Sequence, residues 1–135
     1  MAYRYIGHTA DIIVEGEGKD LAEAIEEAAK GIIERIGRAE KEEISFEVEE
    51  RAENIHELIV NSLSSGIITQ CEIREMQPHS FKILKLDVKG GEKFMKARVG
   101  AGHGKLKDVV KAITYHDLAV EEKQGSAVVR VLLDI

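Results

Sequence analysis

The sequence predicts an α+β fold in which two long amphipathic helices pack on one or more mixed, mainly antiparallel β-sheet layers. Three observations lead to this prediction. Apolar residues recur at three- and four-residue steps in two stretches, they alternate with polar residues in others, and the last stretch is apolar at almost every position. Because a one-sided helix needs another layer to cover its apolar stripe, we expect one compact domain over residues 1–135 with about six to eight strands.

The first predicted helix follows Asp20, with Glu23 three residues later as in a capping box, and Gly37 is a plausible stop. The second opens at Asn54, with Glu57 three residues on. The apolar stripes comprise Leu21, Ala24, Ile25, Ala28, Ile32 and Ile36 in the first helix, and Ile55, Leu58, Ile59, Leu63 and Ile67 in the second.

Alternating apolar residues indicate strands between and after these helices. The "KGGE" turn at 89–92 predicts a hairpin, and a shift in the alternation near Leu84 indicates a bulge or burial on both faces. The only proline, Pro78, is assigned to the connection before this hairpin. The strand residues that would face the core are Ile44, Phe46, Val48, Phe81, Ile83, Leu86, Val88, Met95, Ala97 and Val99.

The final stretch, 128–135, is apolar on both faces, which is typical of a strand in the middle of a sheet. Asp11 opens a short strand that runs to Glu15. If these two strands pair antiparallel, the side chains of Asp11 and Asp134 converge with the terminal carboxylate of Ile135.

Three converging carboxylates repel one another, and a hard divalent cation with oxygen ligands relieves that repulsion. Calcium tolerates looser coordination geometry than magnesium. On spacing alone, however, ordinary roles are favoured: Asp11 as a turn cap, Asp134 in an ion pair with a lysine or arginine, and Ile135 as an apolar residue.

Composition limits the other classes of function. The net charge of −6 does not favour a broad electrostatic grip on nucleic acid, and one cysteine rules out an internal disulfide and a thiolate zinc cluster. Cys71 is expected to be a small buried group near a helix end. With no apolar run long enough for a membrane span and no signal-peptide core, we expect a soluble cytoplasmic protein.

Two further segments contain chemically versatile residues. His116 next to Asp117 suggests a general base, but neighbours on a strand point to opposite faces, so an amphipathic sheet-edge role is favoured. The segment "GAGHGKLK" at 100–107 could cradle a phosphate, yet it does not match the P-loop pattern. We expect a mobile, glycine-rich surface loop with solvated lysines there.

Taken together, "GHTADI" near the start, "VKAITYHDLAV" and the terminal "VLLDI" resemble the archease family. The resemblance covers the whole chain. It implies a small α+β protein that activates an RtcB-type RNA ligase in tRNA splicing, without catalysing ligation itself. Such a protein promotes nucleotidylation of the ligase and its multiple turnover. tRNA halves would be contacted only indirectly, with no membrane association and no stable nucleic-acid binding by this protein alone.

The resemblance also implies a metal site. Its ligands fall on Asp11, Asp134 and the main-chain carboxylate of Ile135, with calcium favoured and magnesium or manganese as alternatives. His8 and His116 are then expected to support these ligands or to contact the ligase, and Lys111 to meet an anionic group on the partner.

Two functions from other classes remain as alternatives. One is a small metal-dependent phosphoester hydrolase that uses His8 or His116 with Asp11, although the sequence offers no second carboxylate-rich motif for a two-metal centre. The other is a binding module that presents RNA ends to an enzyme. The acidic charge and the scarcity of aromatic residues argue against it.

Overall fold

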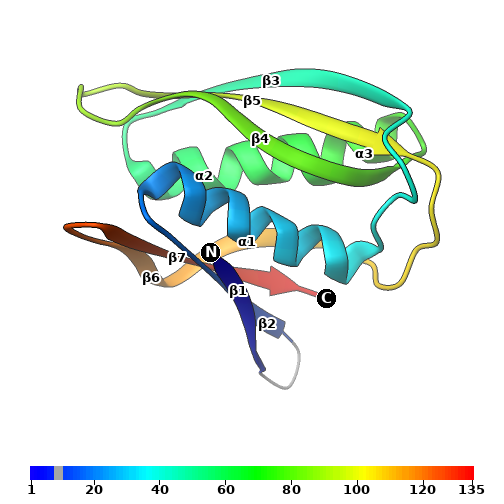
Figure 1. Cartoon of the computed structure of the whole chain (residues 1–135), viewed down its shortest axis with the longest axis horizontal. Helices are drawn as coiled ribbons and strands as arrows, with labels where there is room; N and C mark the ends of the chain where they lie inside the picture. The colour runs from blue at the N-terminus through cyan, green and yellow to red at the C-terminus, as the bar shows by residue number, and fades with distance from the viewer. Residues whose placement is uncertain (8–10) are drawn as a thin grey trace.

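Two antiparallel sheets enclose a layer of helices (Figure 1). The computed structural model describes residues 1–7 and 11–135, and for residues 115–119 it describes the backbone only. Within these residues the elements are β1 (Ala2–Gly7), β2 (Asp11–Gly18), α1 (Leu21–Ile36), β3 (Ile44–Ala52), α2 (Ile55–Leu63), the π-helical segment η1 (Ser64–Thr69), α3 (Gln70–Ile73), β4 (Gln77–Asp87), β5 (Lys93–Gly102), β6 (Ala112–Lys123) and β7 (Ser126–Asp134).

The four-stranded sheet has the order β1-β2-β7-β6, and the three-stranded sheet has the order β3-β5-β4. Every pair of neighbouring strands is antiparallel. Strand β7, apolar on both faces in the sequence, lies between two neighbours as predicted. The predicted fold class, α+β with two main helices on antiparallel sheets, is confirmed.

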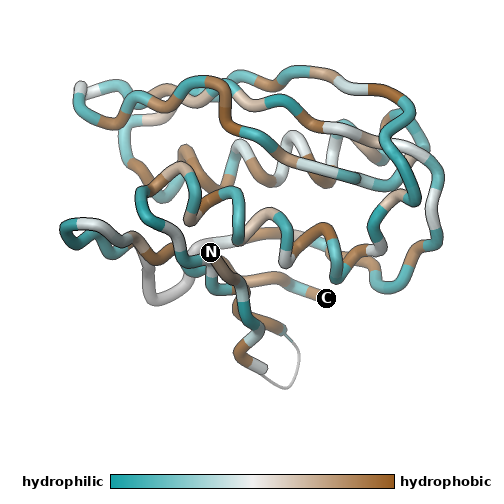
Figure 2. The backbone as a smooth tube through the Cα atoms, viewed as in Figure 1, coloured by the Kyte–Doolittle hydropathy of each residue, from teal (hydrophilic) through white to brown (hydrophobic). Residues whose placement is uncertain are grey.

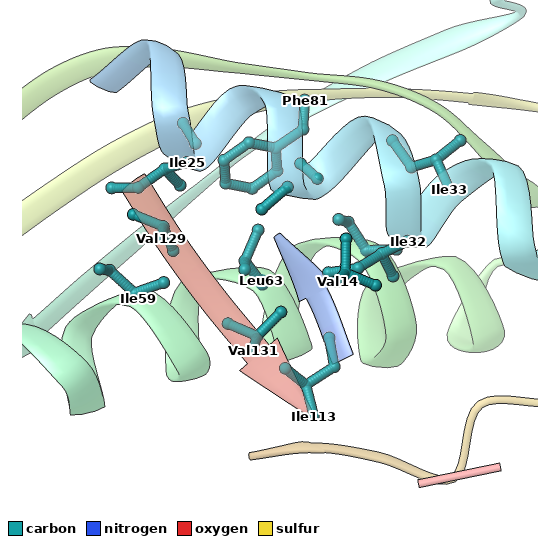
Figure 3. Packing of buried hydrophobic residues seen from close by; sticks show 14 of the residues in the cluster. Val14, Ile25, Ile32, Ile33, Ile59, Leu63, Phe81, Ile113, Val129 and Val131 are labelled. Atoms are coloured by element: carbon teal, nitrogen blue, oxygen red, sulfur yellow. The ribbon is translucent and has the colours of Figure 1, made fainter. Parts of the chain in front are cut away.

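The helices lie between the sheets and are covered on two sides. Helix α1 contacts β1, β2 and β7 of one sheet and β4 of the other, and α2 contacts β6 as well as β3 and β5. The predicted stripe of α1 is buried, but so are Ala29 and Ile33 outside it. In Figure 3, Ile32 and Ile33 leave α1 in different directions. A second sheet therefore buries residues that a one-sided stripe does not include.

The predicted helix ends are confirmed by hydrogen bonds. Asp20 Oδ1 accepts from the amide of Glu23 at 2.8 Å, and Gly37, at φ 119°, ends α1. The Glu23 carboxylate reaches back to the amide of Lys19 at 2.9 Å, one residue earlier than in a standard capping box. Asn54 Oδ1 caps α2 by accepting from the amide of Glu57 at 2.8 Å.

Beyond Leu63 the second helix widens into η1 and then closes again in α3. Cys71, in α3, is 2% exposed, and its Sγ lies 3.6 Å from the carbonyl oxygen of Gly66, to which it donates. Burial raises the pKa of this thiol to about 11. The expectation of a small buried group near a helix end is confirmed, and a raised pKa disfavours the reactive thiolate.

The β4–β5 hairpin forms as predicted, and the strand register shifts between Ile83 and Lys85, which leaves Leu84 exposed. The assignment of Pro78 to a connection was wrong, because β4 begins at Gln77. Proline is tolerated at that position since β4 is an edge strand and its register shifts next to Pro78.

The core is one continuous cluster between the two sheets. Side chains from both sheets and both helices meet there, among them Val14, Ile59, Leu63, Phe81 and Val131 (Figure 3). Along each helix, hydrophobic and hydrophilic residues follow one another within each helical turn (Figure 2). Burial of this shared cluster holds the three layers together.

We predict that Gly16→Ala strongly destabilises the fold. A Cβ at Gly16 would overlap the backbone of Ala24 and Ala28 in α1, so the helix would have to move away from β2. Overpacking of this kind costs about 1–3 kcal/mol of unfolding free energy. Urea titration followed by circular dichroism measures it, with Gly91→Ala as the control because nothing lies within 4 Å of a Cβ at Gly91. Equal stability of the two variants would contradict the close packing of α1 on β2.

Candidate functional site

Strands β2 and β7 pair antiparallel in the register that the sequence analysis required. Asp11 lies opposite Asp134, and Ile12 lies opposite Leu133. Since Ile12 and Leu133 are buried toward the helices, the aspartates one position away point to the outer face of the sheet. Directly opposed residues have Cβ atoms about 4.5–5.5 Å apart, so the two carboxylates share one small region.

The chain end at Asp134 is held on both sides. Its carbonyl oxygen accepts a hydrogen bond from the amide of Lys111 at 2.7 Å, and Ala112 of β6 is its partner opposite β2. The next residue, Ile135, packs its half-buried side chain against the core. These contacts therefore keep the main chain of residues 134–135 beside Asp11, at one end of the two inner strands. We call Asp11, Asp134 and Ile135 the acidic tip.

The two side-chain carboxylates of the acidic tip lack compensation within the described residues. Asp11 is half-buried and Asp134 is exposed, and neither forms an ion pair or hydrogen bond with a side chain that the structure describes. The alternative role of Asp134, pairing with a lysine or arginine, is not found there. Like charges placed directly opposite each other on a sheet are destabilising, so the pair favours a bound cation.

Among the described residues, the three members of the acidic tip offer only oxygen donors to a metal ion. In the part of the chain that the structure describes, no group of three or more His, Cys, Asp or Glu side chains is placed to hold a metal ion. Two aspartates plus main-chain oxygens make a small oxygen set, which suits calcium or magnesium better than zinc. A site of this composition needs oxygen ligands from Ile135 or from a partner.

A charged row lies four residues farther along the same outer face. Glu15 accepts hydrogen bonds from Arg4 Nε at 2.6 Å and from Arg130 Nε at 2.5 Å, and the three residues are directly opposed on β1, β2 and β7. The hydrogen bond from Arg4, with that from Arg130, lowers the pKa of the buried Glu15 carboxyl. Sequence reasoning missed this row because its members are far apart in the chain.

The row fixes the register of the acidic tip. A one-residue slip of β7 against β2 would separate Glu15 from Arg130 and also place Asp11 opposite an apolar residue. The same change would turn Val131 and Leu133 away from the core. Charge pairing on one face and burial on the other therefore select the same alignment.

The remaining predicted site residues are only partly described. His8 lies outside the described residues, and so does the side chain of His116, whose backbone belongs to β6. Lys111 is exposed immediately before β6, next to Asp134 through its amide. The suggested dyad of His116 and Asp117 cannot be placed, since both side chains belong to 115–119.

The glycine-rich segment is only partly a loop. Its first residues, through Gly102, belong to β5, and a Cβ at Gly104 would meet the backbone of Ala39 at 2.8 Å. His103 Nδ1 lies 2.8 Å from the Glu43 carboxylate, and the His103 amide and ring lower the pKa of that carboxyl. The glycines thus allow close packing, while Lys105 and Lys107 are exposed as predicted.

Comparison with known proteins identifies relatives over the whole length of the chain. The model of the "Archease protein family (MTH1598/TM1083)" matches residues 3–135. The protein archease of Pyrococcus abyssi is 32% identical over 130 residues, covering 89% of this chain and 88% of that protein. The protein archease of Sulfolobus acidocaldarius is 28% identical over 141 residues, covering 98% of each.

Two solved structures share the fold. The solution structure of Methanobacterium thermoautotrophicum protein 1598 superposes with a TM-score of 0.77 at 24% identity, covering 99% of both chains. The crystal structure of an "archease, possible chaperone" from Thermotoga maritima gives a TM-score of 0.60 at 23% identity, covering 96% of this chain and 94% of that one. No helix in the described residues is long and apolar enough to cross a membrane.

We predict that Glu15→Gln lowers the free energy of unfolding by about 1–3 kcal/mol at neutral pH, since two charge-assisted hydrogen bonds weaken. A lowered pKa means that the ionised Glu15 stabilises the fold above its ordinary pKa of 4.5, and that this contribution disappears as the pH falls through the lowered value. The gap between wild type and Glu15→Gln should therefore narrow in acid. Denaturant titrations at pH 7 and pH 3 measure it, and a constant gap would argue against an ionised Glu15.

Proposed function

Because the chain belongs to the archease family, we propose that it is a non-catalytic activator of an RtcB-type RNA ligase that acts through a cation at the acidic tip. The observation that supports this most is the alignment of Asp11 with Asp134 at the end of two adjacent strands. Two opposed carboxylates that have no ion pair among the described residues are suited to bind a cation that takes further ligands from elsewhere. In this proposal they act as cation ligands and not as catalytic groups.

In this proposal Asp11 and Asp134 bind the cation through their side chains, and Ile135 contributes its main-chain carboxylate. Calcium fits the set best because it accepts irregular oxygen coordination, whereas magnesium requires near-octahedral geometry. Magnesium and manganese remain candidates for the physiological ion. When bound, the cation supplies positive charge for neutralising phosphate oxygens during nucleotidyl transfer.

The residues of the acidic tip and Lys111 then dock on the ligase and orient the bound cation. The aspartates bind the cation in one geometry. The backbone amide of Lys111 is hydrogen-bonded to Asp134, so its flexible side chain places a positive charge near the acidic tip. A nucleotide phosphate at the ligase active site is a suitable anion for that lysine. In a second version of the mechanism, docking remodels the ligase and the ion only organises the tip. tRNA halves are contacted indirectly in both versions.

We predict that Asp11→Asn and Asp134→Asn each weaken calcium binding by about tenfold or more, which corresponds to about 1.4 kcal/mol. Each change removes one negative charge from a small ligand set. Calorimetry with calcium measures binding, and a multiple-turnover ligation assay with the cognate ligase measures activation. Glu122→Gln is the matched control, since it removes an exposed charge from the far end of the same sheet.

The two assays separate the versions of the mechanism. Loss of both calcium binding and activation supports delivery of the ion to the ligase. Loss of calcium binding with full activation would instead support the second version, in which docking remodels the ligase. If the variants bind calcium like the wild type, the acidic tip is not the cation site.

We also predict that two residues added after Ile135 reduce calcium affinity and ligase activation together. The addition moves the terminal carboxylate away from Asp11 and replaces it with a neutral peptide group, while the side chain of Ile135 can stay packed. The same two residues placed before Met1, which is exposed, serve as the control. Unchanged calcium affinity in the extended protein would remove Ile135 from the ligand set.

A further inference from the structure

An apolar pocket lies on a different part of the molecule from the acidic tip. It has a volume of about 310 Å³, and its walls come from η1 and α3, the start of β4, and residues 106–110. Its aliphatic lining includes Ile67, Ile68, Met76, Leu106 and Val109. The connection between β5 and β6, which includes residues 103–111, descends from the upper to the lower sheet (Figure 1). We call it the 103–111 segment.

Two of these aliphatic side chains are unusually exposed. Leu106 is 53% exposed and Val109 is 60% exposed, whereas Val110, next in the chain, is 5% exposed and belongs to the core. The backbone of the segment is fixed at the same place, because the amide of Lys107 donates to the carbonyl oxygen of Ile36 at 2.7 Å. Apolar side chains displayed on a fixed backbone around a concavity are typical of an interaction site.

The rim of the pocket is acidic. Glu72 and Glu75 line it, both are exposed, and neither carboxylate has an ion pair or hydrogen bond among the described residues. The third acid of the lining, Asp108, is neutralised by Arg35 Nε at 2.9 Å. Since none of the pocket's lining residues is a lysine or arginine, two free negative charges border the apolar surface.

Glu75 occupies a position at which glycine is preferred. It follows α3 with φ 54°, in a turn closed by hydrogen bonds from the amide of Glu75 to Glu72 and from the amide of Met76 to Cys71, each 3.0 Å. In this left-handed helix ending a side chain costs backbone energy that glycine avoids. The chain keeps a glutamate there, with its carboxylate at the rim. Strain of this kind is characteristic of functional positions.

We propose that this pocket docks a segment of the ligase partner that presents an aliphatic side chain flanked by lysine or arginine. The aliphatic group fills the pocket between Val109 and Met76, and the flanking cations meet Glu72 and Glu75. This inference rests on the proposed function for the identity of the partner. The 103–111 segment ends at Lys111 beside the acidic tip, so a single protein can contact both places.

The chemistry of the pocket disfavours other occupants. Its free acids repel the phosphates of RNA, and the net charge of −6 opposes a second copy of the same chain. A small polar metabolite would find few convergent donors among the lining residues, because most of them are aliphatic. A basic, aliphatic peptide segment satisfies both parts of the surface.

The test is the affinity of purified ligase for variants of the full chain, measured by calorimetry. Val109→Arg should weaken binding at least tenfold, because it removes apolar contact and adds a charge of the wrong sign. Leu84→Arg is the control: Leu84 is 45% exposed but lies at the bulge of β4, outside the pocket. Glu72→Gln should weaken binding several-fold and reduce its dependence on salt, with the exposed Glu53→Gln as its control.

Glu75→Gly gives a test that misfolding cannot imitate. Relief of the left-handed backbone should raise the melting temperature by about 2–4 °C, while loss of the carboxylate weakens ligase binding several-fold. A more stable protein that binds the ligase less well would support a docking role for Glu75. Unchanged affinity of Val109→Arg and Glu75→Gly would overturn the inference, as would concentration-dependent dimers of the wild type that Val109→Arg abolishes.

Calcium titrations separate this inference from the proposed function. The pocket variants should bind calcium like the wild type, and Asp134→Asn should not. If Asp134→Asn loses ligase activation while both pocket variants retain full affinity, the pocket proposal fails and the proposed function stands. If the wild type neither binds nor activates the ligase, both are overturned.

Discussion

The pairing of β2 with β7 is the contact on which the rest of the molecule depends. It joins the two ends of the chain in the middle of one sheet and aligns Val14 with Val131 under the helices. On the opposite face the same alignment joins Glu15 to Arg130 and brings Asp11 to Asp134. Hydrophobic burial supplies most of the stabilisation and the charged row supplies register, so the acidic tip is positioned by forces that act elsewhere in the sheet.

The fold is shared with structures that are 24% and 23% identical to this chain, so the three-layer arrangement tolerates wide changes in sequence. The layers provide a frame for the two surfaces to which we assign a role, the acidic tip and the apolar pocket. The 103–111 segment connects these surfaces. It forms one wall of the apolar pocket and ends at Lys111, whose amide donates a hydrogen bond to the carbonyl oxygen of Asp134. A partner recognised along this segment would be oriented with respect to the acidic tip before any cation is engaged.

Much of the fold could be predicted from the sequence because local periodicity determines it. The stripes of both helices, the caps at Asp20 and Asn54 and the central place of the last strand each follow from neighbouring residues. The pairing of β2 with β7 could be stated only as a condition, since nothing local links positions 11 and 134. Burial of Ile33 depends on a second sheet, and the pocket depends on segments that meet only in the folded chain. The charged row is invisible to periodicity for the same reason, whereas the left-handed backbone of Glu75 is missed because a glutamate gives no sequence signal of that conformation.

The double coverage of α1 affects how the molecule opens. Helices on the surface of a domain usually have one face in water, and their amides are open to solvent through local fraying. Here Ala24, Ala28 and Ile32 are fully buried, and sheets lie above and below the helix. Exchange of the amide protons of α1 with deuterium therefore requires the sheets to separate, so these protons report global unfolding. We therefore expect slow exchange in α1, as is more often found in central strands.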